Sequence, residues 1–213
     1  MRYFWHIFAL IVALALITIL FFAFSVNVKN SVSYTNQVKI TVPQVTTADP
    51  SVGPVTAPVT LIDYGDYQCP SCAQIESTLS ALKTAYGDKL RIVWKDLPNS
   101  STHSEAINAA VAARCAGVQG KFWDYHSLLM ANQAQLGNAL YTALAAQLKL
   151  NTNSFSNCLT KQDTLPLVQR TYDEAVALQI PATPSIWLNG VRYVDSLDTP
   201  SLKHSIDALL PTK

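Results

Sequence analysis

The stretch Asp66-Tyr67-Gln68-Cys69-Pro70-Ser71-Cys72 decides how the rest of this sequence is interpreted. It follows Val59 to Tyr64, whose apolar residues alternate between two faces as in a buried strand. It opens a run with apolar residues three and four positions apart, typical of a helix, which Gly87 ends. Because proline is favoured at the first helical position, Cys69 is predicted to be the N-cap and Cys72 the third helical residue.

Two cysteines at the start of a helix suit thiol–disulfide chemistry. The helix N-terminus offers unpaired N–H groups and the positive end of the helix dipole, and both stabilise a thiolate. We therefore predict that the Cys69 sulfur faces the amides of Ser71 and Cys72 and acts as the nucleophile, with Cys72 as the shielded second thiol. Two alternatives stay open: a zinc site completed by Cys115 and Cys158, or two unrelated buried thiols. Because a long segment separates Cys115 from Cys158, we predict no metal.

Length and charge limit the other classes of function. The chain has 213 residues, enough for one domain of ordinary size with its own core behind an N-terminal segment. A net charge of +1 and the lack of a glycine-rich phosphate loop favour neither nucleic acid nor a nucleotide as a ligand. His103 and His126 lie outside any metal-ligand spacing, so we predict them to be structural or exposed.

The N-terminal part of the chain predicts a membrane helix. Phe4 to Phe24 is nearly continuous apolar sequence, about the length that spans a hydrocarbon core. Cleaved signal peptides have hydrophobic regions of roughly 7 to 15 residues, so we interpret residues 1–27 as a membrane anchor or uncleaved signal. Residues 28–56, rich in Ser, Thr, Val, Asn and Pro, are predicted to be an extracytoplasmic linker. Because disulfides persist outside the cytosol, we expect a single-pass cell-membrane protein with its catalytic domain on the extracytoplasmic side.

The remaining residues, 57–213, have the pattern of an α/β domain. A second strand is predicted at Leu90 to Trp94, followed by several helices between about 100 and 165. A hairpin is predicted over 184–194, because Asn189-Gly190 suits a tight type I′ turn. A final helix follows the hairpin. This order of elements predicts a mixed sheet covered by helices.

Four stretches of the soluble part are informative together. They are Ala57-Pro58-Val59-Thr60-Leu61, Asp66-Tyr67-Gln68-Cys69-Pro70-Ser71-Cys72, Gln119-Gly120-Lys121-Phe122-Trp123 and Thr183-Pro184-Ser185-Ile186-Trp187-Leu188-Asn189-Gly190. Through them the run from Asp49 to Leu210 resembles the DsbA-like thioredoxin family of bacterial extracytoplasmic thiol oxidoreductases. The resemblance implies a thioredoxin-like fold whose two halves are separated by a helical insertion at about 100–165.

The resemblance also implies roles for the residues around the cysteines. Pro184 is expected to follow a cis peptide bond, which places the Thr183 backbone beside the cysteines, where it can pair with an extended substrate. Pro70 and Ser71 are expected to support the active site. Ser71 stands where the best-known oxidases have a histidine, so we expect a less strongly stabilised thiolate at Cys69.

Two further pairs of residues receive a role from the resemblance. Asp63 stands where the family often has a buried acid under the active site, with Lys95 as its expected partner. Such a carboxyl could take and return the proton of Cys72, unless Asp63 lies at an exposed strand edge. Cys115 and Cys158 look like the structural disulfide of some family members, the alternative being two buried free thiols.

The function that the resemblance implies is thiol:disulfide exchange without a separable cofactor. We expect an oxidase that donates the Cys69–Cys72 disulfide to cysteine-containing secreted or membrane proteins and is reoxidised by a quinone-linked membrane partner. A disulfide reductase or isomerase of the same fold is one alternative. A redox-inert extracellular peptide-binding module, using the groove at Thr183-Pro184, is an alternative from a different class.

Overall fold

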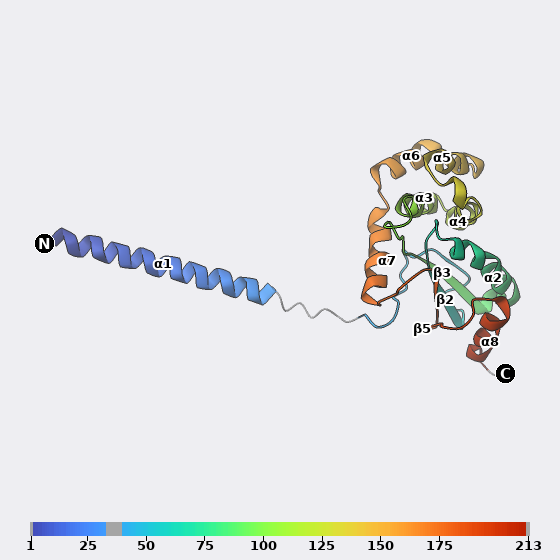
Figure 1. The fold of residues 1–213 in the computed structure, drawn as a ribbon, viewed down its shortest axis with the longest axis horizontal. Coiled ribbons are helices and arrows are strands. Elements are labelled where there is room, and N and C mark those ends of the chain that lie inside the picture. Colours follow the sequence, from blue (N-terminus) through green and yellow to red (C-terminus); the bar gives the residue numbers. More distant parts are fainter. Residues whose placement is uncertain (1, 33–39, 212–213) are drawn as a thin grey trace. The chain divides into compact units, whose positions relative to one another are not determined.

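The computed structural model describes residues 2–32 and 40–211, and the chain divides into two units, Met1–Lys39 and Ile40–Lys213 (Figure 1). In the first unit, α1 (Arg2–Val32) is a single long helix. Its segment Trp5–Phe24 is long and apolar enough to cross a membrane. Length and composition alone do not distinguish a membrane anchor from a signal sequence at the N-terminus.

The second unit is built around one mixed sheet. Its strands are β1 (Ser51–Val52), β2 (Val59–Gly65), β3 (Leu90–Asp96), β4 (Ser185–Leu188) and β5 (Val191–Arg192). They lie in the order β1-β3-β2-β4-β5, with β2 and β3 parallel and every other pair antiparallel. The central strand, β2, is buried along nearly its whole length because both faces of the sheet are covered by helices. The predicted α/β class with a mixed sheet is therefore confirmed.

The predicted linker over residues 28–56 is shortened at both ends. The helix α1 continues to Val32, and the second unit starts at Ile40. Residues 51 and 52 form β1, because their backbone pairs with Val93 and Ile92 of β3. Residues 33–39 of the predicted linker lie outside the described residues.

Helices cover the two faces of the sheet, as Figure 1 shows. The helices α2 (Pro70–Tyr86) and α8 (Thr199–Leu209) pack on one face against apolar side chains that include Val59 and Leu61. The helix α7 (Leu165–Ala177) packs on the other face, where Ile62 and Tyr64 lie. Successive side chains of β2 thus serve two separate cores, as the period of a strand requires.

A block of four helices lies between β3 and α7. It consists of α3 (Ala106–Val118), α4 (Phe122–Ala131), α5 (Asn138–Gln147) and α6 (Thr152–Lys161). Two short 3-10 turns, at Gly87–Lys89 and Gln133–Gln135, follow α2 and α4. The small alanine side chains of α3 are buried between α4 and α6, and a disulfide joins Cys115 of α3 to Cys158 of α6. The block agrees with the helical insertion predicted at about 100–165.

Candidate active site

Cys69 and Cys72 lie where the central strand leads into α2. Cys69 is the N-cap residue, with an extended backbone, and Pro70 is the first residue of the helix. Only 8% of Cys69 is exposed, and Cys72 is completely buried. The fold therefore leaves one sulfur close to the surface and encloses the other.

The Cys69 sulfur faces a backbone carbonyl from another part of the chain. Its Sγ–H group donates to the oxygen of Thr183, 3.5 Å away, and the Thr183–Pro184 peptide bond is cis. This orientation differs from the one predicted, toward the amides of Ser71 and Cys72. Within the part of the chain that the structure describes, Cys69 makes no side-chain cap hydrogen bond. Both cysteines are free thiols here, and an S–H donor requires an acceptor, whereas the amides of a helix N-terminus are donors.

The Cys72 thiol is held in its protonated form. Burial raises its pKa, and the negative charge of Asp63 raises it further. The Asp66 N–H group, 3.5 Å from the Cys72 sulfur, lowers the pKa without offsetting burial. Because the thiolate is the reactive form of cysteine, Cys72 is a weak nucleophile at neutral pH.

Asp63 is a buried carboxyl on the central strand β2. Burial raises its pKa well above the ordinary value, and the charge of Glu76 acts in the same direction. Neither carboxyl oxygen has a hydrogen-bond partner among the residues that the structure describes. Asp63 is therefore not at an exposed strand edge, and a protonated carboxyl at this position can supply a proton.

The predicted pairing of Lys95 with Asp63 is wrong. In the register of β2 and β3, Lys95 lies opposite Tyr64, so its side chain leaves the face of the sheet opposite to that of Asp63. There the Lys95 ammonium lies 2.8 Å from the Glu174 carboxylate and 3.1 Å from the Asp49 carboxylate. Lys95 therefore belongs to a buried ion cluster on the α7 side.

Asp66, which the sequence did not single out, organises the loop that carries the cysteines. Its side chain is almost fully buried and accepts hydrogen bonds from Gln68 N–H at 2.7 Å and Asn99 N–H at 2.8 Å. The ring of His103 donates to the same carboxylate from Nδ1, also at 2.8 Å. Asn99 and His103 are 33 and 37 residues away in the chain, a distance at which no local pattern reveals a contact.

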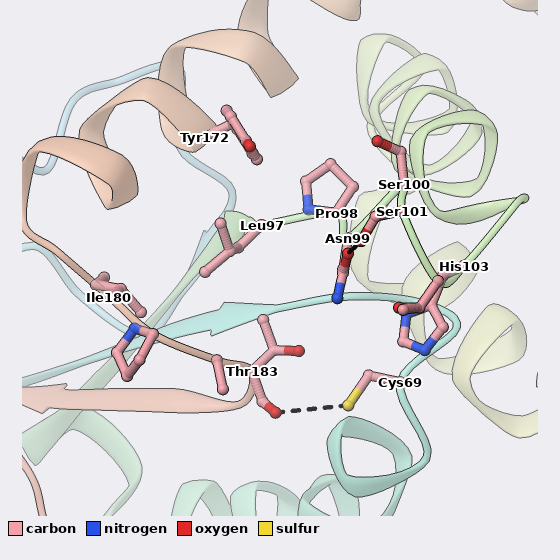
Figure 2. Close-up of a pocket in the computed structure, with 13 residues that line it drawn as sticks. Cys69, Leu97, Pro98, Asn99, Ser100, Ser101, His103, Tyr172, Ile180 and Thr183 are labelled. Carbon is pink, nitrogen blue, oxygen red and sulfur yellow. Dashed lines mark hydrogen bonds between the residues drawn. The ribbon is translucent and has the colours of Figure 1, made fainter.

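A pocket of about 490 Å³ opens beside Cys69 (Figure 2). Its lining combines apolar and uncharged polar side chains with one histidine. The lining residues are Cys69, Leu97, Pro98, Asn99, Ser100, Ser101, Thr102, His103, Tyr172, Ile180, Pro181, Ala182 and Thr183. The pocket thus brings the β3–α3 loop and the chain before β4 to the accessible sulfur.

His126 lies in a different environment, among the aromatic side chains of the core. It is 1% exposed, and its ring centroid lies 4.6 Å from that of Trp94. Its Nδ1 lies 2.9 Å from the Tyr67 hydroxyl, and its Nε2 lies 3.1 Å from the Glu76 carboxylate. These contacts give His126 a structural position between α4 and α2.

The zinc alternative requires four thiolates. The disulfide between Cys115 and Cys158 occupies two of the four sulfur atoms. Cys69 and Cys72 therefore stand alone as a dithiol pair.

Comparison with known proteins places this fold in a family. A sequence profile described as Thioredoxin matches residues 45–208. The chain belongs to the thioredoxin family. This thioredoxin-family chain is also 35% identical over 154 residues to the Na(+)/H(+) antiporter NhaA 1 of Salinispora arenicola. The match covers 72% of the chain but only 24% of that protein, so the chain spans about a quarter of the length of this curated relative.

Solved thioredoxin-like structures agree with the fold. BdbD from Bacillus subtilis, in its oxidised form, is 23% identical with a TM-score of 0.72, over 79% of this chain and 95% of BdbD. The thiol-disulfide exchange protein alpha-DsbA2 from Wolbachia pipientis is 17% identical with a TM-score of 0.69, over 77% and 88% of the two chains. The resemblance to DsbA-like proteins is thus confirmed at the level of the fold.

Proposed function

We propose that this protein is a thiol:disulfide oxidoreductase that donates a Cys69–Cys72 disulfide to cysteine pairs in secreted or membrane proteins. The observation that carries the proposal is the unequal position of the two sulfurs. Cys69 adjoins a pocket and the Thr183 carbonyl, whereas Cys72 is enclosed and its pKa is raised. The similarity to alpha-DsbA2 of Wolbachia pipientis, a thiol-disulfide exchange protein, supports the same chemistry.

The exchange begins with the Cys69–Cys72 disulfide. A substrate thiolate attacks the Cys69 sulfur, the bond between the two cysteines breaks, and Cys72 leaves with the electron pair. A second substrate thiolate then attacks the substrate sulfur of the mixed disulfide and releases Cys69. The substrate gains a disulfide, and its two electrons remain on the reduced cysteine pair.

Asp63 is proposed to supply the proton that Cys72 needs when it leaves. Burial raises the pKa of Cys72, and the charge of Asp63 raises it further, so a proton passed from Asp63 to Cys72 is held there. Because its own pKa is raised, the Asp63 carboxyl holds a proton that it can pass to the departing Cys72 thiolate. Reoxidation of the pair returns that proton to Asp63.

The weak nucleophilicity of Cys72 favours an oxidase over a reductase. A reductase is released from its substrate when the second cysteine attacks the mixed disulfide, and this attack requires a Cys72 thiolate. The raised pKa of Cys72 slows that attack and prolongs the mixed disulfide. The second substrate thiol then has time to complete the oxidation.

The backbone beside Cys69 is proposed to hold the substrate. The Thr183 carbonyl is an acceptor next to the reactive sulfur, suited to the backbone N–H of an extended peptide. Pro70 and Ser71 set the first turn of α2 and are proposed to support the geometry of Cys69.

The location proposed is the extracytoplasmic side of the cell membrane, with Trp5–Phe24 as a single span. The Cys115–Cys158 disulfide supports an oxidising compartment. Sustained turnover requires an electron acceptor, and we assign this part to a quinone-linked membrane partner.

The test is the reduction potential of the Cys69–Cys72 pair in the full-length protein, equilibrated with glutathione while Cys115 and Cys158 are followed separately. We expect a value closer to about −120 mV, a strong oxidant, than to about −270 mV, which is typical of a reductase. A value of about −270 mV would indicate that the protein is a reductase. Failure of the pair to exchange would favour a redox-inert peptide-binding module.

A further inference from the structure

His103 occupies a fixed position at the pocket beside Cys69. Its Nδ1 lies 2.8 Å from the Asp66 carboxylate, which is buried, and its own side chain is 22% exposed. Because a carboxylate only accepts, Nδ1 carries the hydrogen of this bond. In the neutral ring the free lone pair therefore lies on Nε2.

The free nitrogen of His103 is available to a bound molecule. Within residues 2–32 and 40–211, Nε2 has no hydrogen-bond partner, whereas both ring nitrogens of His126 are engaged. His103, Cys69 and Thr183 line the same pocket, and Figure 2 draws the His103 ring at the same end of it as Cys69. A buried acid thus orients an accessible base at the mouth of the dithiol site, an arrangement typical of nucleophile activation.

We propose that His103 is the general base of the second exchange step, with Asp66 as its positioning residue. This inference rests on the proposed oxidoreductase function. The Nε2 atom of His103 takes the proton from the second substrate thiol, and the resulting thiolate attacks the substrate sulfur of the mixed disulfide. The new substrate disulfide forms as the bond to Cys69 breaks, and Cys69 leaves as a thiolate opposite the protonated His103.

Neither Ser71 nor Cys72, which follow Cys69 in the first turn of α2, supplies this function. Ser71 has no charge, and the thiol of Cys72 is enclosed and protonated. A free thiol is mostly protonated at neutral pH, so an incoming substrate thiol benefits from a base at the point of attack. A cation next to the leaving sulfur also speeds its departure and favours the reduced pair, which makes the disulfide more oxidising.

The decisive variant is His103→Asn. The side-chain N–H₂ of asparagine can replace Nδ1–H as the donor to Asp66, but asparagine has no counterpart of the basic Nε2 atom. The variant therefore preserves the contact that holds the loop and removes the proposed base. His204→Asn on the exposed face of α8 is the matched control, because it makes the same change far from the cysteines.

The rate of the second exchange step, the release of Cys69 from its mixed disulfide, is measured in isolation. Full-length protein carrying Cys72→Ser is loaded with glutathione at Cys69, and a second glutathione then releases oxidised glutathione and the free Cys69 thiol. Intact-protein mass spectrometry follows the loss of the adduct at pH 7. We expect His103→Asn to slow this release about 10- to 100-fold, at or below the lower end of general acid–base effects. The control should match the parent protein.

A second measurement excludes a merely structural role. With Cys72 restored, His103→Asn should make the disulfide less oxidising by about tenfold in its equilibrium with glutathione, which is about 30 mV, while the melting temperature stays unchanged. If the rate of glutathione release and the reduction potential of the variant both equalled those of the parent protein, the inference would be overturned. A failure of the proposed function would give a different result: the Cys69–Cys72 pair of the parent protein would not exchange with glutathione at all.

Discussion

Lys95 and Asp49 form a completely buried ion pair, with 3.1 Å between the Lys95 ammonium and the Asp49 carboxylate. The pair ties β3 to the chain segment that precedes β1, and the Glu174 carboxylate brings α7 to the same ammonium at 2.8 Å. The Gln44 carbonyl accepts a further hydrogen bond from Lys95 at 2.6 Å. One cation therefore holds three parts of the domain together.

Removal of this cation should destabilise the domain strongly. Lys95→Met removes the ammonium from two buried carboxylates, although Asp49 keeps its ion pair with Arg170 and Glu174 keeps the Gln44 N–H group. We therefore expect a loss of about 3 kcal/mol in the free energy of unfolding, the lower end of the cost of breaking a buried ion pair. Urea unfolding of residues 40–213 at pH 7 measures the loss. The matched change Lys203→Met, at an exposed position of α8, should cost less than about 0.5 kcal/mol. Equal effects of the two variants would contradict the role of the cluster.

The same cluster predicts how acid affects stability. Burial would raise the pKa of Asp49, but the Thr46 N–H group and the charge of Lys95 outweigh it, so the pKa lies below the ordinary value of 3.8. A lowered pKa contributes stability that is complete above the ordinary value and is lost as the pH falls through the folded value. Asp49→Asn should therefore be less stable than the parent at pH 7 and lose less on acidification below about pH 4. Parallel stability curves below pH 4 would contradict this.

The contribution of Asp63 to the free energy of unfolding should depend on pH in the opposite direction to that of Asp49. The raised pKa of Asp63 keeps the folded state protonated while the unfolded chain ionises, so stability decreases as the pH rises above the ordinary value of 3.8 toward the folded pKa. Asp63→Asn removes this titration, and its curve of unfolding free energy against pH should be flatter than that of the parent. The same variant should slow formation of the mixed disulfide, because Cys72 loses its proton donor. An unchanged exchange rate from pH 5 to 8 would exclude the relay.

Gly65 should tolerate no side chain. A Cβ atom at this position would lie 2.2 Å from the Trp94 ring, and that ring packs against Tyr67 and His126. We expect Gly65→Ala to cost roughly 1–3 kcal/mol, because overpacking displaces the ring. Gly117→Ala is the control, since its Cβ would meet Phe122 at 3.4 Å. Thermal melting of both variants checks the difference, and equal melting temperatures would count against the close contact.

The disulfide of the helical insertion should contribute stability rather than exchange chemistry. It closes a loop of 43 residues, which in the chain-entropy treatment corresponds to about 4 kcal/mol. The double variant Cys115→Ala with Cys158→Ala should unfold at lower urea concentration and still exchange at Cys69. Alkylation of both cysteines in the nonreduced parent would show instead that they are free thiols.

Local patterns in the sequence determined most of the fold and the position of the dithiol. The period of Val59 to Tyr64 predicted a central strand, and proline after Cys69 predicted the start of the helix. These signals work because strand period and helix start depend on residues within a few positions of one another. The family resemblance extended them to the thioredoxin-like fold with its helical insertion.

Only the tertiary structure decided which partners surround the cysteines. The register of β2 and β3 sends Lys95 to the face opposite Asp63, and a shift of one residue would have reversed this outcome. The contact between Asp66 and His103 likewise joins residues 37 positions apart. Pairings of this kind depend on how strands and loops meet in space, so the sequence alone located the dithiol, and packing determined the groups that surround it.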